Sequence, residues 1–147
     1  MENENNFQDA FLELLLIHKM DVRALSEKTG ISQSRLYAYK SGEHIPSYEN
    51  AAKIADLFEC SFDYLFGLVD ERQQERYILT STPTERFRKI IMESGLTRYK
   101  ISKLTGITES KLSLWFAGKK IPELSSLYLL AKNLPCSLDY LAGRDKI

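Results

Sequence analysis

The chain has 147 residues, of which 44% are hydrophobic and 27% are charged, and its 20 Lys and Arg are balanced by 20 Asp and Glu. This composition excludes a disordered chain, and no apolar run approaches the roughly 18 residues that a membrane span needs. Residues 1–6 are polar and acidic, unlike a secretion signal, so we expect a cytoplasmic protein that does not contact a membrane.

The two halves of the chain differ in charge. Residues 1–76 contain 14 Asp and Glu against 8 Lys and Arg, a net of −6, whereas residues 77–147 contain 6 against 12, a net of +6. Such an asymmetry indicates different electrostatic roles for the two halves. The alternative interpretation is that the halves attract each other or a second copy of the chain.

Five helices are predicted in the first half. The first, from Phe7 to His18, has an apolar band wider than one face needs, which indicates either a well-buried helix or an association surface. The other four are each preceded by an Asp or Ser that suits a helix N-cap, and they are expected over residues 22–29, 33–41, 48–58 and 62–66. We expect no β-strands.

A tight turn joins the second and third of these helices. Gly30 suits the left-handed conformation just beyond a helix C-terminus, and Leu36 and Tyr39 are spaced to face the core. The outward faces of the third helix carry small or polar residues, as in a helix that enters the DNA major groove. We expect these residues to be exposed: Gln33, Ser34, Tyr37 and Ala38.

The whole pattern recurs 76 residues later, without a gap, from Phe11 to Gly67. Such a match indicates a tandem duplication of one unit. We therefore expect a first, acidic domain over residues 1–67, a linker over residues 68–81, and a second, basic domain over residues 82–147.

The second half repeats the helical prediction. Thr82, Pro83 and Glu85 form a typical helix start. The core of this half is expected to include Phe87, Ile90 and Ile91, and residues 144–147 are expected to fray. The two cysteines, Cys60 and Cys136, lie at matching positions and are interpreted as small core residues.

Each unit resembles the helix-turn-helix family of phage repressors and Cro-type regulators. In the first unit the resemblance lies in Leu25-Ser26, Gly30-Ile31-Ser32, Leu36, Gly42, Ile45-Pro46-Ser47 and the segment from Ser61 to Gly67. The second unit repeats the pattern. The resemblance implies an all-α fold of two consecutive five-helix, lambda-repressor-like helix-turn-helix domains, each with its third helix in the major groove.

The resemblance also implies which residues contact DNA. Its base-reading positions correspond to Gln33, Ser34, Tyr37 and Ala38 in the first unit and to Glu109, Ser110, Ser113 and Leu114 in the second. Gln pairs with adenine and Glu accepts from cytosine, although a carboxylate at Glu109 is also explained by the dipole of its helix. The expected phosphate contacts are Arg35, Arg98, Lys111, Lys119 and Lys120.

The sequence thus predicts a sequence-specific, DNA-binding transcriptional regulator of a bacterium or phage, which uses two helix-turn-helix units on double-stranded DNA and forms a homodimer. The alternative is a protein-interaction or dimerisation module in which one or both units no longer read DNA, with the first domain recruiting a protein partner. We find no convergent set of nucleophile, base or metal ligands, so we expect no enzyme, no catalytic residues, no metal and no cofactor.

Overall fold

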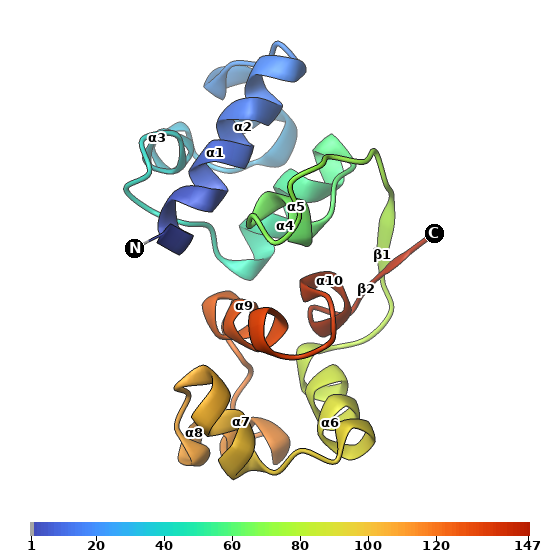
Figure 1. The fold of residues 1–147 in the computed structure, drawn as a ribbon. Coiled ribbons are helices and arrows are strands. Elements are labelled where there is room, and N and C mark those ends of the chain that lie inside the picture. The colour runs from blue at the N-terminus through green and yellow to red at the C-terminus, as the bar shows by residue number, and fades with distance from the viewer. Residues whose placement is uncertain (1) are drawn as a thin grey trace. The chain divides into compact units, whose positions relative to one another are not determined.

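A computed structural model of the protein describes residues 2–147. It divides into two compact units, residues up to Tyr77 (unit 1) and residues from Ile78 onward (unit 2), which are described separately (Figure 1). Because Tyr77 is uncharged, the net charges of −6 and +6 apply to these units. None of the helices within residues 2–147 is both long and apolar enough to cross a membrane.

Unit 1 is a bundle of five helices. They are α1 (Glu2–Ile17), α2 (Val22–Thr29), α3 (Gln33–Lys40), α4 (Tyr48–Phe58) and α5 (Phe62–Leu65). Helix α1 packs against α3 and α5, and α4 packs against α2 and α5. The predicted helices are therefore present, although α1 begins before the expected Phe7.

Aromatic side chains form the centre of this bundle. Phe7 and Phe11 are fully buried on α1, and their rings stack with centroids 5.4 Å apart. Tyr39 of α3 meets the Phe7 ring edge-on at 5.8 Å. The inward-facing position predicted for Tyr39 is confirmed, and it fixes α3 against α1. Leu16 and Ile17, at the end of α1, are instead 79% and 50% exposed.

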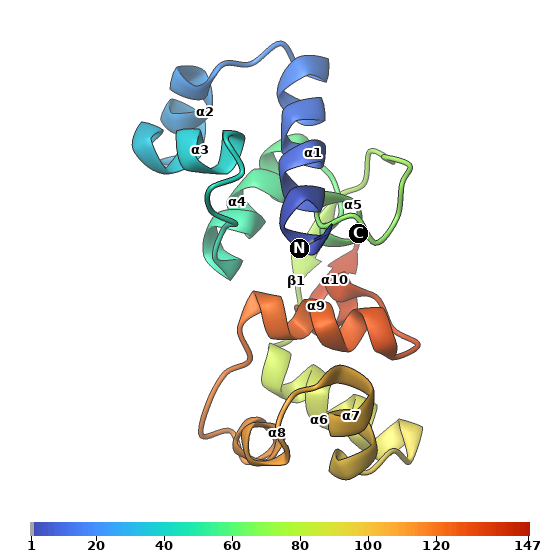
Figure 2. The same cartoon turned by 60° about the vertical axis from the view of Figure 1, so that its left-hand side comes forward.

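Unit 2 repeats this arrangement, as the second view shows (Figure 2). Its helices are α6 (Pro83–Ser94), α7 (Arg98–Thr105), α8 (Glu109–Phe116), α9 (Leu124–Asn133) and α10 (Leu138–Leu141). Helix α8 packs against α6 and α7, and α9 packs against α7 and α10. The equivalent pairs of unit 1 make the same contacts, as a duplication requires.

The core of unit 2 contains fewer of the predicted α6 residues than expected. Phe87 is fully buried, but Ile90 and Ile91 are only half-buried. Arg86 takes a buried position instead, with 8% of its surface exposed. The two cysteines also differ, since Cys60 is buried and Cys136 is half-buried. Hydropathy predicts Ile90 and Ile91 in the core, whereas α6 buries Arg86 with its polar partners Asp145, Tyr140 and Thr80.

Two short strands contradict the expectation of no β-structure. Strand β1 (Tyr77–Leu79) pairs with β2 (Arg144–Lys146), so the C-terminal residues are paired rather than frayed. Arg144 is buried, and its Nε donates to the Asp139 carboxylate at 3.2 Å. Strands of three residues are too short to show an alternating pattern, which explains why the sequence did not predict them.

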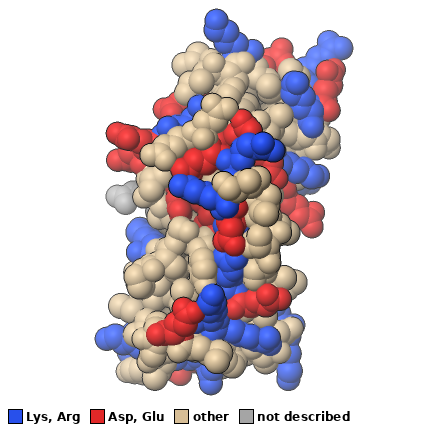
Figure 3. All heavy atoms as spheres, turned by 90° about the vertical axis from the view of Figure 1, so that its right-hand side faces the viewer, with Lys and Arg blue, Asp and Glu red and all other residues tan. Residues whose placement is uncertain are grey.

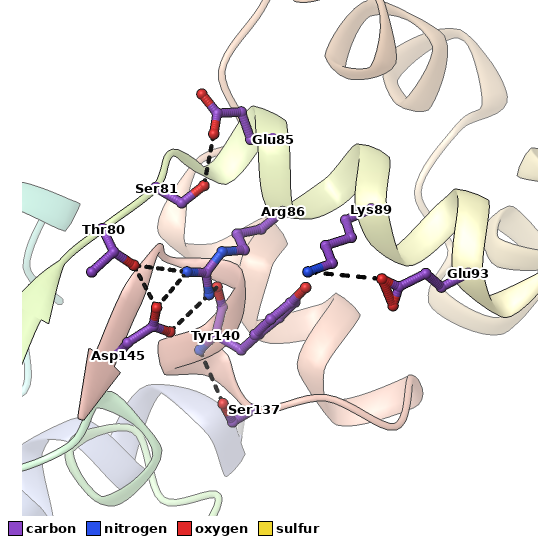
Figure 4. A network of polar contacts seen from close by, with 9 residues as sticks. All are labelled: Thr80, Ser81, Glu85, Arg86, Lys89, Glu93, Ser137, Tyr140 and Asp145. Carbon is purple, nitrogen blue, oxygen red and sulfur yellow. Dashed lines mark hydrogen bonds and ion pairs between the residues drawn. The ribbon is translucent and has the colours of Figure 1, made fainter. Parts of the chain in front are cut away.

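A polar network fastens these strands to α6 (Figure 4). The Arg86 guanidinium donates to both oxygens of the Asp145 carboxylate, at 3.0 and 2.8 Å, and to the Tyr140 carbonyl at 2.9 Å. It also donates to the Thr80 hydroxyl at 2.9 Å. Arg86 therefore joins the residues before α6 to the C-terminal strand. Unit 1 has Ala10 at the position of Arg86.

The first part of the segment predicted as a linker packs on unit 1. The Arg72 guanidinium donates to the Phe58 carbonyl at 3.0 Å and lies 2.9 Å from Nε2 of His18. The amide of Glu75 donates to the Glu59 carbonyl at 2.8 Å. Residues 72–75 thus hold to the end of α4, whereas Thr80 binds within unit 2.

Candidate nucleic-acid interface

The turns between α2 and α3 and between α7 and α8 have the same local structure. Gly30 and Gly106 adopt left-handed φ angles of 77° and 79°. Their amides donate to Ser26 and Ser102 carbonyls, at 2.8 Å in both cases. A side chain at this conformation would be strained, so glycine sets the sharp angle between the two helices.

A threonine before each glycine closes the turn, a role that helical spacing and capping preferences did not predict. The Thr29 hydroxyl donates to the Leu25 carbonyl at 2.8 Å and accepts from the Ile31 amide at 3.2 Å. Thr105 makes the equivalent bonds at the same distances. The signal in the sequence that could have predicted this role is the Thr-Gly pair, which occurs at the same place in both turns.

Each turn leads directly into a capped helix. The Ser32 hydroxyl accepts from the Arg35 amide at 3.2 Å, and the Thr108 hydroxyl accepts from the Lys111 amide at 3.2 Å. These bonds satisfy amides that have no partner within the helix. The first turns of α3 and α8 are therefore fixed, and their outward side chains project from a rigid backbone.

The structure exposes most of the predicted base-reading residues. In unit 1, Gln33 and Ser34 are exposed and Tyr37 is 55% exposed. In unit 2, the outward residues Glu109, Ser110 and Ser113 are exposed. They share one side of each third helix, as the sequence spacing predicts.

The expected exposure of Ala38 is wrong. Only 8% of its surface is accessible. The chain folds back after α3, and the Ala38 carbonyl accepts from the amides of Glu43 and His44, at 2.9 and 3.2 Å. Its counterpart Leu114 is half-buried, and its carbonyl accepts from the same kind of turn. Helical spacing alone could not predict the burial of this position.

The five predicted phosphate contacts are all exposed: Arg35, Arg98, Lys111, Lys119 and Lys120. The last two follow α8, and their amides donate to the Leu114 carbonyl at 2.9 and 3.3 Å. The loop that carries them is therefore tied to the C-terminal part of α8.

The two helix-turn-helix segments, residues 21–46 and 97–122, differ in net charge. The first has four Lys and Arg against three Asp and Glu, whereas the second has six against one. In the first segment Arg23 is also paired with Glu27 at 3.6 Å. Over much of the face in Figure 3, basic and acidic side chains are interspersed.

The first helix of each unit holds the end of its third helix, a contact that the sequence analysis missed. Nε of Arg88 on α6 donates to the Phe116 carbonyl at 2.7 Å. In unit 1, the Gln8 side chain on α1 donates to the Lys40 carbonyl at 3.1 Å. The two acceptors are equivalent, but their donors lie at different positions of the first helix. A comparison of matched positions therefore could not reveal the contact.

A family model for the helix-turn-helix matches residues 13–65 and 87–141, one region in each unit. The two regions together span most of the chain. The chain belongs to the Cro/C1-type helix-turn-helix family. The predicted resemblance and the all-α fold of two consecutive helix-turn-helix domains are thereby confirmed.

Two curated relatives are similar to part of the chain. The transcriptional repressor RstR of the cryptic phage CTXphi, from Vibrio cholerae serotype O1, is 42% identical over 52 residues, which cover 34% of this chain and 46% of the relative. The uncharacterised helix-turn-helix-type transcriptional regulator YobD of Bacillus subtilis is 32% identical over 59 residues, or 40% and 53% of the two chains. The chain spans about half the length of these relatives. No solved structure matches it significantly.

Proposed function

We propose that the protein is a DNA-binding transcriptional regulator that uses both helix-turn-helix units. The observation that supports this most is that both units have the same capped turn and the same exposed outer side of the third helix. Backbone rigidity there matters, because base readout depends on side chains placed against specific base edges. The similarity to two proteins named as transcriptional regulators points in the same direction.

Base reading is assigned to the outward residues that the structure exposes: Gln33, Ser34, Tyr37, Glu109, Ser110 and Ser113. Gln33 is the strongest candidate for a base contact, since a Gln side chain can bind adenine through two hydrogen bonds. Glu109 is the first residue of α8, where the helix dipole also favours a carboxylate. Leu114 is a lesser candidate because it is half-buried.

Unit 2 is proposed to supply most of the affinity. Its helix-turn-helix segment has five more cations than carboxylates, against one more in unit 1. Each cation that neutralises a phosphate releases counterions, and this term dominates binding that does not depend on sequence. Unit 1 then contributes base contacts and, with unit 2, extends the interface.

Two reading units are proposed to act together on one site, either in one chain or in a homodimer. A single module of this size covers only roughly 600–1,000 Å² of protein surface. Two modules double the interface and therefore give specific binding at moderate salt. The duplication provides both modules in one chain.

Binding of the intact protein to random duplex DNA, measured at low and moderate salt, tests the proposal. We expect binding that weakens as salt rises, and a footprint longer than one helix-turn-helix module covers. No binding even at low salt would contradict the proposal and favour a protein-interaction module. A footprint of one half-site with a monomer bound would contradict the joint use of two units.

A further inference from the structure

Phe116, the last residue of α8, lies between two arginines of unit 2. From α6, Arg88 holds its carbonyl through the 2.7 Å bond described above. From the start of α7, the Arg98 guanidinium lies over its ring, 5.3 Å from the centroid. Arg98 is the residue for which the family resemblance implies a phosphate contact.

We propose that Phe116 is a positioning residue, whose ring holds the Arg98 guanidinium where it binds a DNA phosphate. This inference rests on the proposed function and adds a specific device to it. A guanidinium has five N–H donors in a planar fork, so contact with a ring leaves donors for phosphate oxygens. The aromatic ring attracts the cation and restricts a long side chain that would otherwise sample many rotamers.

Phe116 can position Arg98 only if Phe116 is itself fixed. Its side chain is half-buried, and the neighbouring Trp115 is 2% exposed and meets the Phe87 ring edge-on at 5.8 Å. The Arg88 bond places a cation at the C-terminal end of α8, which the helix dipole favours. Two contacts with α6 therefore fix the end of α8 that presents the ring.

A comparison of the two units shows that the contact between Arg98 and Phe116 is not required for this fold. Unit 1 retains the contact that anchors its third helix, through Gln8 and the Lys40 carbonyl. It has Val22 and Lys40 at the positions of Arg98 and Phe116, so it lacks both the guanidinium and the ring. The same bundle thus forms without the pair. The pair occurs in the unit whose helix-turn-helix segment is the more basic.

The test is a double-mutant cycle on the intact protein, with random duplex DNA as the probe. Phe116→Leu should raise the dissociation constant about two- to fivefold, the loss expected for one exposed cation–π contact. Phe116→Tyr, which keeps a ring, should bind like the wild type. Arg98→Gln should lower the magnitude of the salt slope by about 0.9, because one phosphate contact is lost.

The cycle distinguishes positioning from a general effect on folding. In the Arg98→Gln background, Phe116→Leu should cause no further loss, because the cation that it positions is gone. Lys132→Gln removes the same charge from α9 and should leave the salt slope closer to that of the wild type than Arg98→Gln does. Thermal unfolding checks that each variant is folded, and Phe116→Met replaces Phe116→Leu if that variant unfolds.

An equal loss from Phe116→Leu in both backgrounds would overturn the inference, since the ring would then act independently of Arg98. A Phe116→Tyr variant as weak as Phe116→Leu would overturn it as well. Both results leave the proposed function intact, because the wild type still binds. Absence of wild-type binding would overturn the proposed function and the inference with it.

Discussion

At the scale of single residues, we propose that the outward side of each third helix determines which DNA sequence is preferred. Gln33→Ala and Ser110→Ala should change the preferred sequence more than they change binding to random duplex DNA, because base contacts specify and phosphate contacts position. Selection of bound sequences from a random pool measures the preference. Unchanged preferences for both variants would remove these residues from the reading surface.

A second residue-scale prediction concerns His18 and its contact with Arg72. Arginine donates only, so Nε2 of His18 must accept, and the imidazole there is neutral. The pKa of His18 is held below its ordinary 6.5, first by burial and second by the positive charge of Arg72. A folded-state pKa below the unfolded one stabilises the fold above pH 6.5, and this stabilisation is lost as the pH falls through the folded value.

We therefore expect the stability of unit 1 to fall as the medium is acidified from about pH 7.5 to about pH 5. In His18→Gln the amide oxygen accepts from Arg72 at every pH, so this variant should show a flatter dependence. Chemical unfolding over this range gives the comparison, with His44→Gln as the matched substitution at the other histidine. The same pH dependence in His18→Gln as in the wild type would contradict the assignment.

Residue types allowed many of these positions to be predicted, but not all of them. Helical spacing predicts that Gln33 is exposed and that Tyr39 faces the core, and residue type predicts the N-caps Ser32 and Thr82. Arg86 does not, because its burial depends on acceptors 54 and 59 residues away in the chain. Hydropathy alone predicts that an arginine such as Arg86 is exposed.

At the scale of elements, the close approach of the C-terminal strand to the residues before α6 requires Gly143. It has a φ of +84°, and a Cβ atom there would lie 2.2 Å from the Ser81 carbonyl oxygen. The two backbones are also hydrogen-bonded here, since the Thr80 amide donates to the Gly143 carbonyl at 2.9 Å. A side chain at this position would separate the two backbones.

Gly143→Ala should therefore destabilise unit 2 by more than Gly106→Ala. Gly106 has a similar φ of +79° with nothing within 4 Å of an added Cβ, so its substitution costs only the left-handed strain of about 1–2 kcal/mol. Chemical denaturation of both variants measures the difference. Equal losses would show that the strand and the Ser81 backbone separate easily.

Local sequence predicts where the helices begin, but it does not predict the two strands. Helices α2, α4 and α6 begin directly after their predicted N-caps, which are Asp21, Ser47 and Thr82. Strands β1 and β2 have three residues each, and their pairing joins residues near 78 with residues near 145. Neither strand has enough residues for a local signal, so the sheet follows from contacts that only the folded chain creates.

At the scale of the whole molecule, the sequence alone revealed the duplication, but the segment between its copies required the structure. The sequence predicts a linker over residues 68–81. In the structure, Arg72 and Glu75 of this segment bond to the end of α4, and Thr80 bonds to Arg86 in unit 2. Residues from this segment therefore bond to each folded unit.

The lysines after α8 provide a prediction at this scale. Lys119→Glu combined with Lys120→Glu should weaken binding to all duplexes and reduce the magnitude of the salt slope, because two phosphate contacts are lost at about 0.9 each. The preferred sequence should stay the same, since these residues contact no base in the proposal. Titrations at several salt concentrations, with selection from random DNA, give both quantities. An altered preference with an unchanged slope would contradict their assignment to phosphates.

Charge reversal at two equivalent positions tests most directly the proposal that unit 2 supplies most of the affinity for DNA. Arg35 on α3 and Lys111 on α8 are 76 residues apart, lie at the same position of their helices, and are both exposed. Binding of the intact wild type, Arg35→Glu and Lys111→Glu to random duplex DNA should be measured from about 50 to about 200 mM salt. We predict that the wild type binds and that Lys111→Glu loses more affinity, and more of the salt slope, than Arg35→Glu. Equal losses, or a greater loss in Arg35→Glu, would contradict the claim that unit 2 supplies most of the affinity for DNA.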